Sequence, residues 1–133
     1  MSKNIYKYSQ KHNWVKLKRT VVEIGVTDYF LNELGALIDL SLPKVGDEVI
    51  SGISYGEIES LNTLSDLVSP VSGGVVKVNT EIVTKLKYIQ KIPFHDGWFI
   101  KVRIADPDQI DALMDEEEYE EYKKGFKKRR KKL

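Results

Sequence analysis

The chain has 133 residues and a formal net charge of +1, and 41% of its residues are hydrophobic. This length suits a single domain with a hydrophobic core, and the composition indicates a globular rather than a disordered chain. There is no cysteine, which excludes disulfides, thiolate metal sites and cysteine nucleophiles. No apolar run is long enough to span a bilayer, and residues 1–7 lack a signal-peptide core. We therefore expect a soluble, cytoplasmic protein.

The charges are segregated along the chain. Residues 123–133 contain eight Lys or Arg and no acid, which leaves 13 bases against 20 acids, a net charge of about −7, in the remainder. We therefore expect an acidic folded domain at residues 1–122 and a basic C-terminal tail at residues 123–133. An acidic surface aids solubility, and it also speeds encounter with basic docking surfaces.

The first third of the chain predicts a β-hairpin and then a short helix. Residues 14–17 and 20–25 are rich in β-branched and apolar side chains and flank Lys18-Arg19, which is typical of a hairpin. Thr27 can cap a helix, and Gly35 can end it. The expected buried face of this helix consists of Phe30, Leu31 and Leu34.

Residues 37–42 alternate between apolar and polar side chains, which predicts a half-buried strand. Ile38, Leu40 and Leu42 are expected to face the core. Asp39 and Ser41 are expected on the other side.

The rest of the chain predicts further short strands and two more helices. Residues 54–60 and 67–68 are expected strands on either side of a tight tip, and residues 75–78 and 98–104 are later strands. Residues 81–91 predict a helical turn and a loop. Asp106-Pro107 is typical of a helix start, and Asp115 with Glu118 resembles a capping box. Many short strands between turn signals indicate a small sandwich or flattened barrel.

One motif matches a hydrolase signature. Gly52-Ile53-Ser54-Tyr55-Gly56 fits G-x-S-x-G, with Asp66 and His95 following in hydrolase order. That motif needs a strand, a strained turn and then a helix. Residues 57–60 predict a strand instead, so we interpret the motif as a glycine-flanked turn.

The sequence offers no metal site. His12 and His95 are far apart and have no paired spacing, and His12 is expected to pack at a strand edge beside Trp14. The acidic run Glu116, Glu117, Glu118, Glu120 and Glu121 lacks calcium-loop spacing. It is interpreted as a solvated helix face or, alternatively, as a docking face.

The basic tail leaves several interpretations open. It can be a fraying terminus, a docking segment for an acidic partner, or a binder of nucleic acid or anionic lipid. Its single aromatic residue, Phe126, does not indicate a base-stacking platform. Helical spacing could also pair Glu120 and Glu121 with Lys123 and Lys124, which would extend the last helix.

The order and spacing of several motifs resemble the glycine cleavage system H protein family. The resemblance covers about residues 8–122 and is strongest from Tyr55 to Gly73. The matching segments are Lys11-His12-Asn13-Trp14-Val15, Ile24-Gly25-Val26-Thr27-Asp28-Tyr29, Leu42-Pro43-Lys44-Val45-Gly46-Asp47-Glu48-Val49, Ser69-Pro70-Val71-Ser72-Gly73 and Gly97-Trp98-Phe99-Ile100-Lys101-Val102.

The resemblance implies that residues 55–73 form the family's lipoyl-carrier hairpin. In that family a lysine at the tip is acylated by lipoate, which carries the aminomethyl group left by glycine decarboxylation. Asn62 occupies the lysine position here, flanked by Glu59, Ser60 and Asp66. No lysine occurs in residues 45–76, so we expect no bound cofactor and no catalytic residue.

The resemblance also implies a fold and a set of partners. The expected fold is mainly β, a lipoyl/biotinyl-type barrel-sandwich hybrid with short helices and a C-terminal helix. The implied partners are glycine decarboxylase, an aminomethyltransferase, dihydrolipoamide dehydrogenase and lipoylation enzymes. Two further departures, Asn13 for the usual glutamate and residues 84–91 without an Asn-Pro-Glu-Leu type segment, predict a changed arm-docking surface.

Three hypotheses follow for function. The leading one is a non-lipoylated binding or adaptor protein of lipoate and one-carbon metabolism, not itself an enzyme. The second is a working aminomethyl carrier lipoylated elsewhere, with Lys77 as the nearest candidate downstream. The third is a nucleic-acid-associated protein that uses the basic tail.

Overall fold

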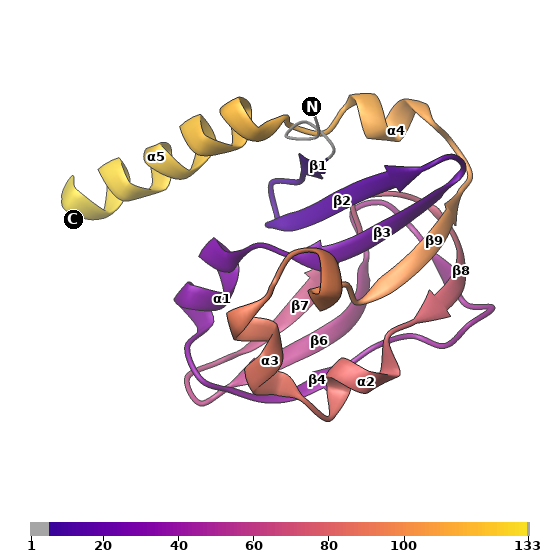
Figure 1. Cartoon of the computed structure of the whole chain (residues 1–133). Helices are drawn as coiled ribbons and strands as arrows, with labels where there is room; N and C mark the ends of the chain where they lie inside the picture. The colour runs from indigo at the N-terminus through magenta and orange to yellow at the C-terminus, as the bar shows by residue number, and fades with distance from the viewer. Residues whose placement is uncertain (1–5, 133) are drawn as a thin grey trace.

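Two antiparallel β-sheets and five α-helices make up the protein in our computed structural model, which describes residues 6–132 and, for side chains, residues 6–125. A six-stranded sheet has the order β1-β2-β3-β9-β8-β5, and a three-stranded sheet has the order β4-β6-β7. Figure 1 shows the two sheets stacked as layers, with α1, α2 and α3 along one side and α4 and α5 across the top. This is the expected mainly β barrel-sandwich with short helices.

The strands of the larger sheet come from both ends of the chain. They are β1 (Tyr6–Tyr8), β2 (Asn13–Lys18), β3 (Val21–Val26), β5 (Glu48–Val49), β8 (Gly73–Val78) and β9 (Ile100–Ile104). The smaller sheet contains β4 (Leu37–Ser41), β6 (Ser54–Ser60) and β7 (Leu64–Val68). The predicted hairpin is confirmed as β2–β3, but its turn is Arg19-Thr20 rather than Lys18-Arg19, because Lys18 still pairs with Val21. Arg19 takes the left-handed backbone angle (φ 60°) that this tight turn needs.

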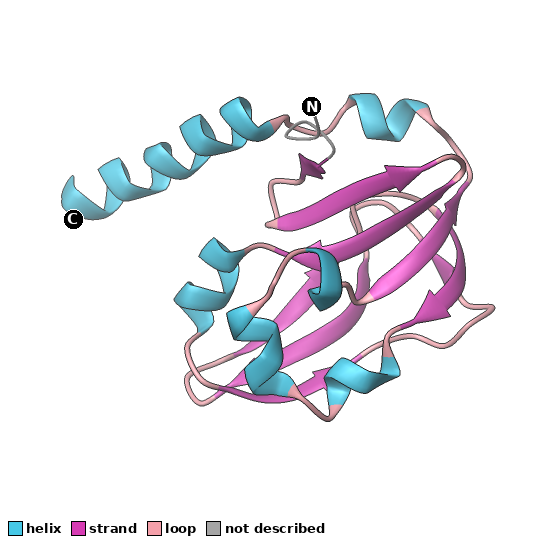
Figure 2. Cartoon of the chain, viewed as in Figure 1, coloured by secondary structure: helices cyan, strands magenta, loops and turns pink. Residues whose placement is uncertain are grey.

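The helices are short except for the last, as Figure 2 shows in cyan. They are α1 (Asp28–Leu34), α2 (Thr80–Val83), α3 (Leu86–Lys91), α4 (Asp108–Asp111) and α5 (Glu116–Lys132), with a 3-10 turn at His95–Gly97. The predicted caps of α1 are confirmed, because Thr27 Oγ1 accepts from Phe30 N at 3.3 Å and Gly35 has φ 84°. The capping box of α5 is also confirmed by reciprocal bonds of Asp115 N to Glu118 (2.9 Å) and Glu118 N to Asp115 (2.8 Å).

Three predicted elements differ in detail. Ile38 does not face the core: its exposed fraction is 50%, because the β4–β6 register shifts between Leu37 and Asp39 and an extra residue interrupts the alternation. The helical turn expected within residues 81–91 is present as α2, but α3 stands where a loop was expected. The last strand begins at Ile100 rather than at residue 98, since Trp98 ends the preceding 3-10 turn.

The main hydrophobic core lies between the two sheets. Its fully buried side chains include Ile24, Ile58, Leu67, Ile100 and Val102. A second cluster around Trp14, Tyr8 and Tyr119 joins β1 and β2 to α5. A Cβ at Gly25 would come within 2.6 Å of the Trp14 ring, so the ring needs glycine on the neighbouring strand.

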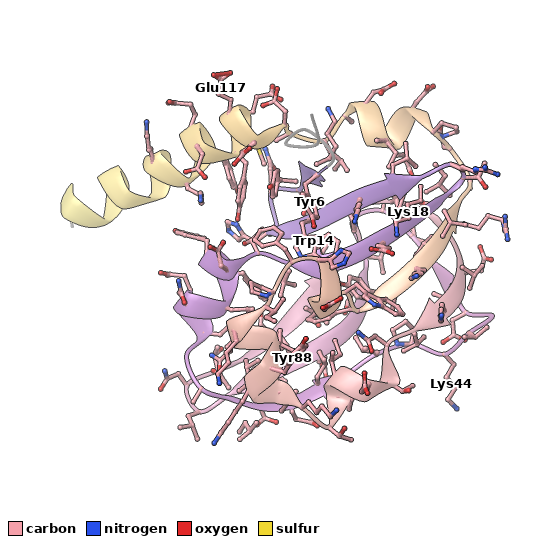
Figure 3. All side chains as sticks on the ribbon, viewed as in Figure 1. Tyr6, Trp14, Lys18, Lys44, Tyr88 and Glu117 are labelled. Carbon is pink, nitrogen blue, oxygen red and sulfur yellow. The ribbon has the colours of Figure 1, made fainter. Side chains whose placement is uncertain are left out.

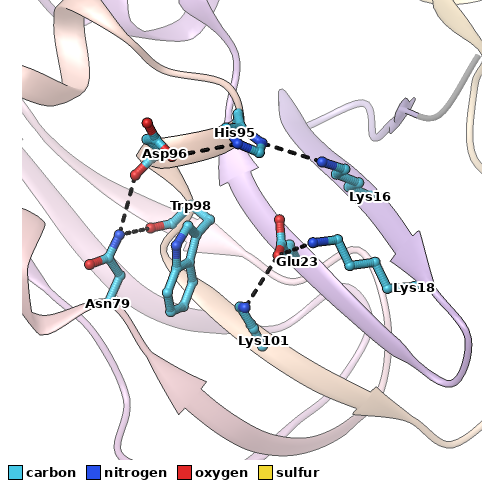
Figure 4. A network of polar contacts seen from close by, with 8 residues as sticks. All are labelled: Lys16, Lys18, Glu23, Asn79, His95, Asp96, Trp98 and Lys101. Carbon is cyan, nitrogen blue, oxygen red and sulfur yellow. Dashed lines mark hydrogen bonds and ion pairs between the residues drawn. The ribbon is translucent and has the colours of Figure 1, made fainter. Parts of the chain in front are cut away.

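A buried carboxylate bridges three strands of the larger sheet. Glu23 on β3 pairs with Lys18 at 3.2 Å and with Lys101 of β9 at 3.3 Å, as Figure 4 shows. Burial by itself raises the pKa of Glu23, but hydrogen bonds and positive charge from the two lysines outweigh it and hold the pKa below its usual value. Lys101 also lies 4.8 Å from the centre of the Trp98 ring. The ion pairs therefore tie together β2, β3 and β9.

A single buried amide connects the two sheets. Asn13, at the start of β2, has an exposed fraction of 1%. Its Nδ2 donates to the Val68 carbonyl at 2.7 Å and to Ser9 Oγ at 3.1 Å, and its Oδ1 accepts from the Tyr55 hydroxyl at 3.0 Å. Val68 ends β7 and Tyr55 lies in β6, so Asn13 fixes the smaller sheet against the larger one.

His12, next to Asn13 in the turn before β2, contacts the last helix. His12 does not lie on a strand edge as expected, because it sits in the turn before β2 with φ 68°. Its Nδ1 lies 2.8 Å from the Tyr119 hydroxyl, which is 2.7 Å from Thr27 Oγ1. The rings of Tyr29, Phe30, Tyr119 and Tyr122 surround the imidazole. Burial lowers the pKa of His12 to about 4.

The Asn13 contact predicts a large effect of an isosteric change. Asn13→Asp at pH 7 places an acceptor against the Val68 carbonyl and removes both donors, so the free energy of unfolding should fall by about 2–3 kcal/mol. The difference in unfolding free energy between the variant and the wild type should become smaller at low pH, because a protonated carboxyl can donate again. Urea unfolding measures both effects. Asn32→Asp, an exposed site on α1, is the matched control, and equal stability of the two variants would contradict the role of Asn13.

The lowered pKa of His12 predicts acid sensitivity. Between about pH 6.5 and 4 the unfolded chain takes up a proton that the folded chain does not, so stability falls as the pH falls through this window. Because the His12 imidazole is partly exposed, solvent screens this loss of stability, and we expect it to be on the order of 1–2 kcal/mol. His12→Gln should flatten this part of the stability profile, whereas His95→Gln should retain it. An unchanged profile in His12→Gln would show that another group titrates.

Candidate functional site

The β6–β7 hairpin ends in a tip, Ser60-Leu61-Asn62-Thr63, whose last three residues are exposed. Glu59 and Leu64 form the last strand pair before it. The tip is closed by a hydrogen bond from Ser60 N to the Thr63 carbonyl at 2.8 Å, and Leu61 N donates to the Ala36 carbonyl at 2.9 Å. The tip is therefore fastened both to itself and to the chain between α1 and β4.

Ser60 organises the backbone of the tip. Its side chain is buried, and its Oγ accepts from Asn62 N and from Thr63 N, each at 3.2 Å. A buried hydroxyl that binds two successive backbone amides fixes the local conformation. Ser60 was expected to flank Asn62. Its hydrogen bonds to the backbone of the tip are evident only from the three-dimensional structure.

Asn62 is exposed in the middle of the tip, between Leu61 and Thr63. A Cβ on Gly35 would lie 3.4 Å from Asn62 Nδ2, so the amide rests beside the C-terminal end of α1. The Gly35 carbonyl in turn accepts from Gln90 Nε2 of α3 at 2.9 Å. The tip, α1 and α3 thus form one continuous surface.

Acidic residues cover the outer face of the smaller sheet. Asp39 is opposite Glu59, and Glu57 is opposite Asp66, while Ile58 between them points into the core. Among the described residues none of these four carboxylates forms an ion pair; Asp66 accepts only from Ser54 Oγ at 3.2 Å. Like charges directly opposite each other are unfavourable in a sheet, so fold stability does not account for this arrangement.

Large apolar side chains are exposed around the same tip. The exposed fractions are 73% for Leu61, 59% for Leu64 and 50% for Ile38. The sequence does not mark these residues as functional: Ile38 was expected in the core, and Leu61 and Leu64 lie within a hairpin whose exposure depends on its packing. Together they give the tip a surface that a partner could bury.

Comparisons with known proteins agree on one family. The family model "Glycine cleavage H-protein" matches residues 6–126. This chain belongs to the glycine cleavage H-protein family. It is 37% identical over 116 residues to the glycine cleavage system H protein of one Staphylococcus epidermidis strain, and 36% identical to that of another, with 87% of this chain and 92% of each relative covered. The crystal structure of a glycine cleavage system H protein from Mycobacterium marinum is similar with a TM-score of 0.80 and 34% identity, covering 87% of this chain and 94% of that one.

The family's lipoyl carriers need an amine at the tip, and this hairpin has none. Asn62 stands at the tip, and no lysine occurs in residues 45–76. Lys77 lies within β8 of the other sheet, in register opposite Lys101. Lys44 lies in the turn after β4, at the opposite end of that strand from the tip, and Figure 3 shows it pointing away from the body. The residues at the tip therefore do not fit covalent attachment of lipoate through an amide.

The structure explains why asparagine suits position 13. A glutamate usual in the family would place a longer, acceptor-only group against the Val68 carbonyl, whereas the amide of Asn13 both donates and accepts. The Asn13 side chain is buried between the sheets and does not reach the surface of the tip.

The hydrolase-like motif is a turn into a strand, as predicted. Ser54 begins β6, with Oγ donating to the Gly56 carbonyl at 3.0 Å and to Asp66 at 3.2 Å. His95 contacts Lys16 and Asp96 instead (Figure 4). Ser54 and His95 are not brought together.

The described residues contain no group of three or more His, Cys, Asp or Glu that could hold a metal ion, and no helix among them is long and apolar enough to cross a membrane.

The basic segment continues the last helix. The predicted pairs are confirmed, with Lys123 to Glu120 at 3.0 Å and Lys124 to Glu121 at 3.3 Å. The α5 backbone extends to Lys132 across the expected boundary after residue 122, so the division into two units stays a prediction. The side chains from Phe126 onward, on which the tail interpretations depend, lie outside the described residues.

Proposed function

We propose that this protein is a non-lipoylated H-protein-like adaptor of lipoate and glycine-decarboxylation metabolism, acting in the cytoplasm and not itself an enzyme. The observation that carries the proposal is Asn62 at the exposed tip of an otherwise family-like hairpin. The nitrogen of a side-chain amide is delocalised into its carbonyl and is not nucleophilic, so it cannot be acylated as a lysine amine can. The adaptor needs no cofactor for this role.

The tip supports a binding role because it keeps a surface suited to docking. Leu61 and Leu64 expose apolar area, and burying one leucine side chain contributes about 2 kcal/mol. Asp39, Glu57, Glu59 and Asp66 supply negative charge beside it, which favours partners whose docking face is basic. Such a protein occupies the carrier-binding face of a partner without delivering an aminomethyl group.

The partners follow from family membership and from this surface. Glycine decarboxylase, the aminomethyltransferase and lipoylation enzymes all receive the carrier hairpin in the family. An adaptor with this tip would compete with a lipoylated carrier for the same face. The second hypothesis, a carrier modified at Lys77, is less well supported, because that lysine lies within a strand and not at a tip.

The first test is lipoylation. After co-expression with lipoate ligase, the wild-type protein should keep its unmodified intact mass, and Asn62→Lys should gain one lipoyl group, because the hairpin frame is otherwise retained. Peptide mapping assigns any added mass. A lipoyl gain by the wild type, at Lys77 or elsewhere, would overturn the non-carrier role, and Thr63→Lys serves as a control for lysine at the neighbouring position.

The second test is competition. The wild-type protein should inhibit a bacterial glycine decarboxylase assayed with a lipoylated H protein, competitively with that carrier. Leu61→Asp should raise the inhibition constant at least about tenfold, equivalent to about 1.4 kcal/mol. Leu17→Asp, at an exposed leucine on β2, is the matched control and should inhibit like the wild type. Absence of inhibition by the wild type would argue against this partner.

A further inference from the structure

A surface groove lies beside the edge strand of the smaller sheet, where α2 and α3 pack against β4. Its volume is about 600 Å³, within the range of about 300–1,000 Å³ typical of small-molecule pockets. The lining residues are Leu37, Val83, Thr84, Lys85, Leu86, Lys87, Tyr88 and Lys91. None of the acidic or apolar residues assigned above to the docking tip is among them.

The floor of the groove is apolar and well supported. Leu37, Val83 and Leu86 are half-buried and pack against the main core. Tyr88 rises at the side with an exposed fraction of 38%, and Figure 3 shows it on α3. Because the core holds these side chains from beneath, an apolar surface stays available to a ligand without rearrangement.

The rim of the groove is positively charged. Lys85 pairs with Glu81 at 3.5 Å, whereas Lys87 and Lys91 have no ion pair among the described residues. Lys87 and Lys91 are four residues apart on α3 and therefore lie on the same face of the helix. Residues 1–122 carry a net negative charge of about −7, so this cluster is opposite in sign to the net charge of the domain.

We propose that this groove binds a medium-chain aliphatic carboxylate, with its chain on Leu37, Val83 and Leu86 and its carboxylate at Lys87 and Lys91. The apolar floor selects for the chain, since each buried methylene contributes about 0.8 kcal/mol. The two ammonium groups select for the anionic end. The binding is non-covalent and does not depend on the adaptor function proposed for the tip.

Three ligands test the proposal in NMR titrations of the isotope-labelled full chain. Octanoate should shift the amide signals of residues 83–91 and Leu37 in a saturable way. Octanamide, the neutral analogue, should bind about three- to tenfold more weakly, because exposed charge pairs each contribute less than about 1 kcal/mol. Butyrate should bind at least tenfold more weakly than octanoate, because it buries fewer methylenes.

Matched variants test which lysines bind the carboxylate and whether the ligand binds in this groove. Lys87→Gln/Lys91→Gln should weaken octanoate binding about three- to tenfold and leave octanamide binding unchanged. Lys44→Gln/Lys77→Gln removes the same charge from exposed positions elsewhere and should leave both affinities unchanged. Equal affinities for octanoate and octanamide, equal effects of the two double variants, or shifts confined to other surfaces would each overturn the proposal. So would the absence of saturable shifts up to the solubility of octanoate.

Discussion

The hydrogen-bonded amide of Asn13 is the contact on which the relative position of the two sheets depends. The hydrophobic core between the sheets is non-directional, and it could tolerate small changes in how one layer lies on the other. Asn13 removes that freedom, because its side chain must form hydrogen bonds with Val68, Ser9 and Tyr55 at the same time. Val68 and Tyr55 belong to the two strands of the tip hairpin. The position of the tip is therefore set from the buried end of that hairpin.

The tip itself is rigid for local reasons. Ser60 binds two backbone amides, and Leu61 is hydrogen-bonded to the Ala36 carbonyl. The surface around it combines exposed apolar side chains with unpaired carboxylates, an arrangement that costs stability in the isolated protein. The docking role proposed above would make use of such a surface. In the proposed adaptor, asparagine at position 62 provides no acyl acceptor, while the hairpin that presents this position is retained.

The two proposed surfaces differ in charge and in partner. The outer face of β4, β6 and β7 is acidic and suits a basic protein partner, whereas the groove beside α2 and α3 has a lysine rim and suits an anionic ligand. They are linked through Gln90, which donates from α3 to Gly35 beside Asn62. One small domain can therefore offer a macromolecular surface and a small-molecule surface on adjacent parts of the same sheet.

The sequence by itself determined the local structure and the absence of a lysine from the hairpin tip. The caps at Thr27 and Asp115, the β2–β3 hairpin and the absence of a tip lysine follow from short-range patterns, because capping, turn formation and amine chemistry depend on a few neighbouring residues. The tertiary structure alone decided the rest. The bulge that exposes Ile38 depends on pairing with β6, the burial of Asn13 depends on two strands more than forty residues away, and the groove exists only because α2 and α3 pack on β4. These features arise from contacts between distant segments, and no local pattern encodes which segments will meet.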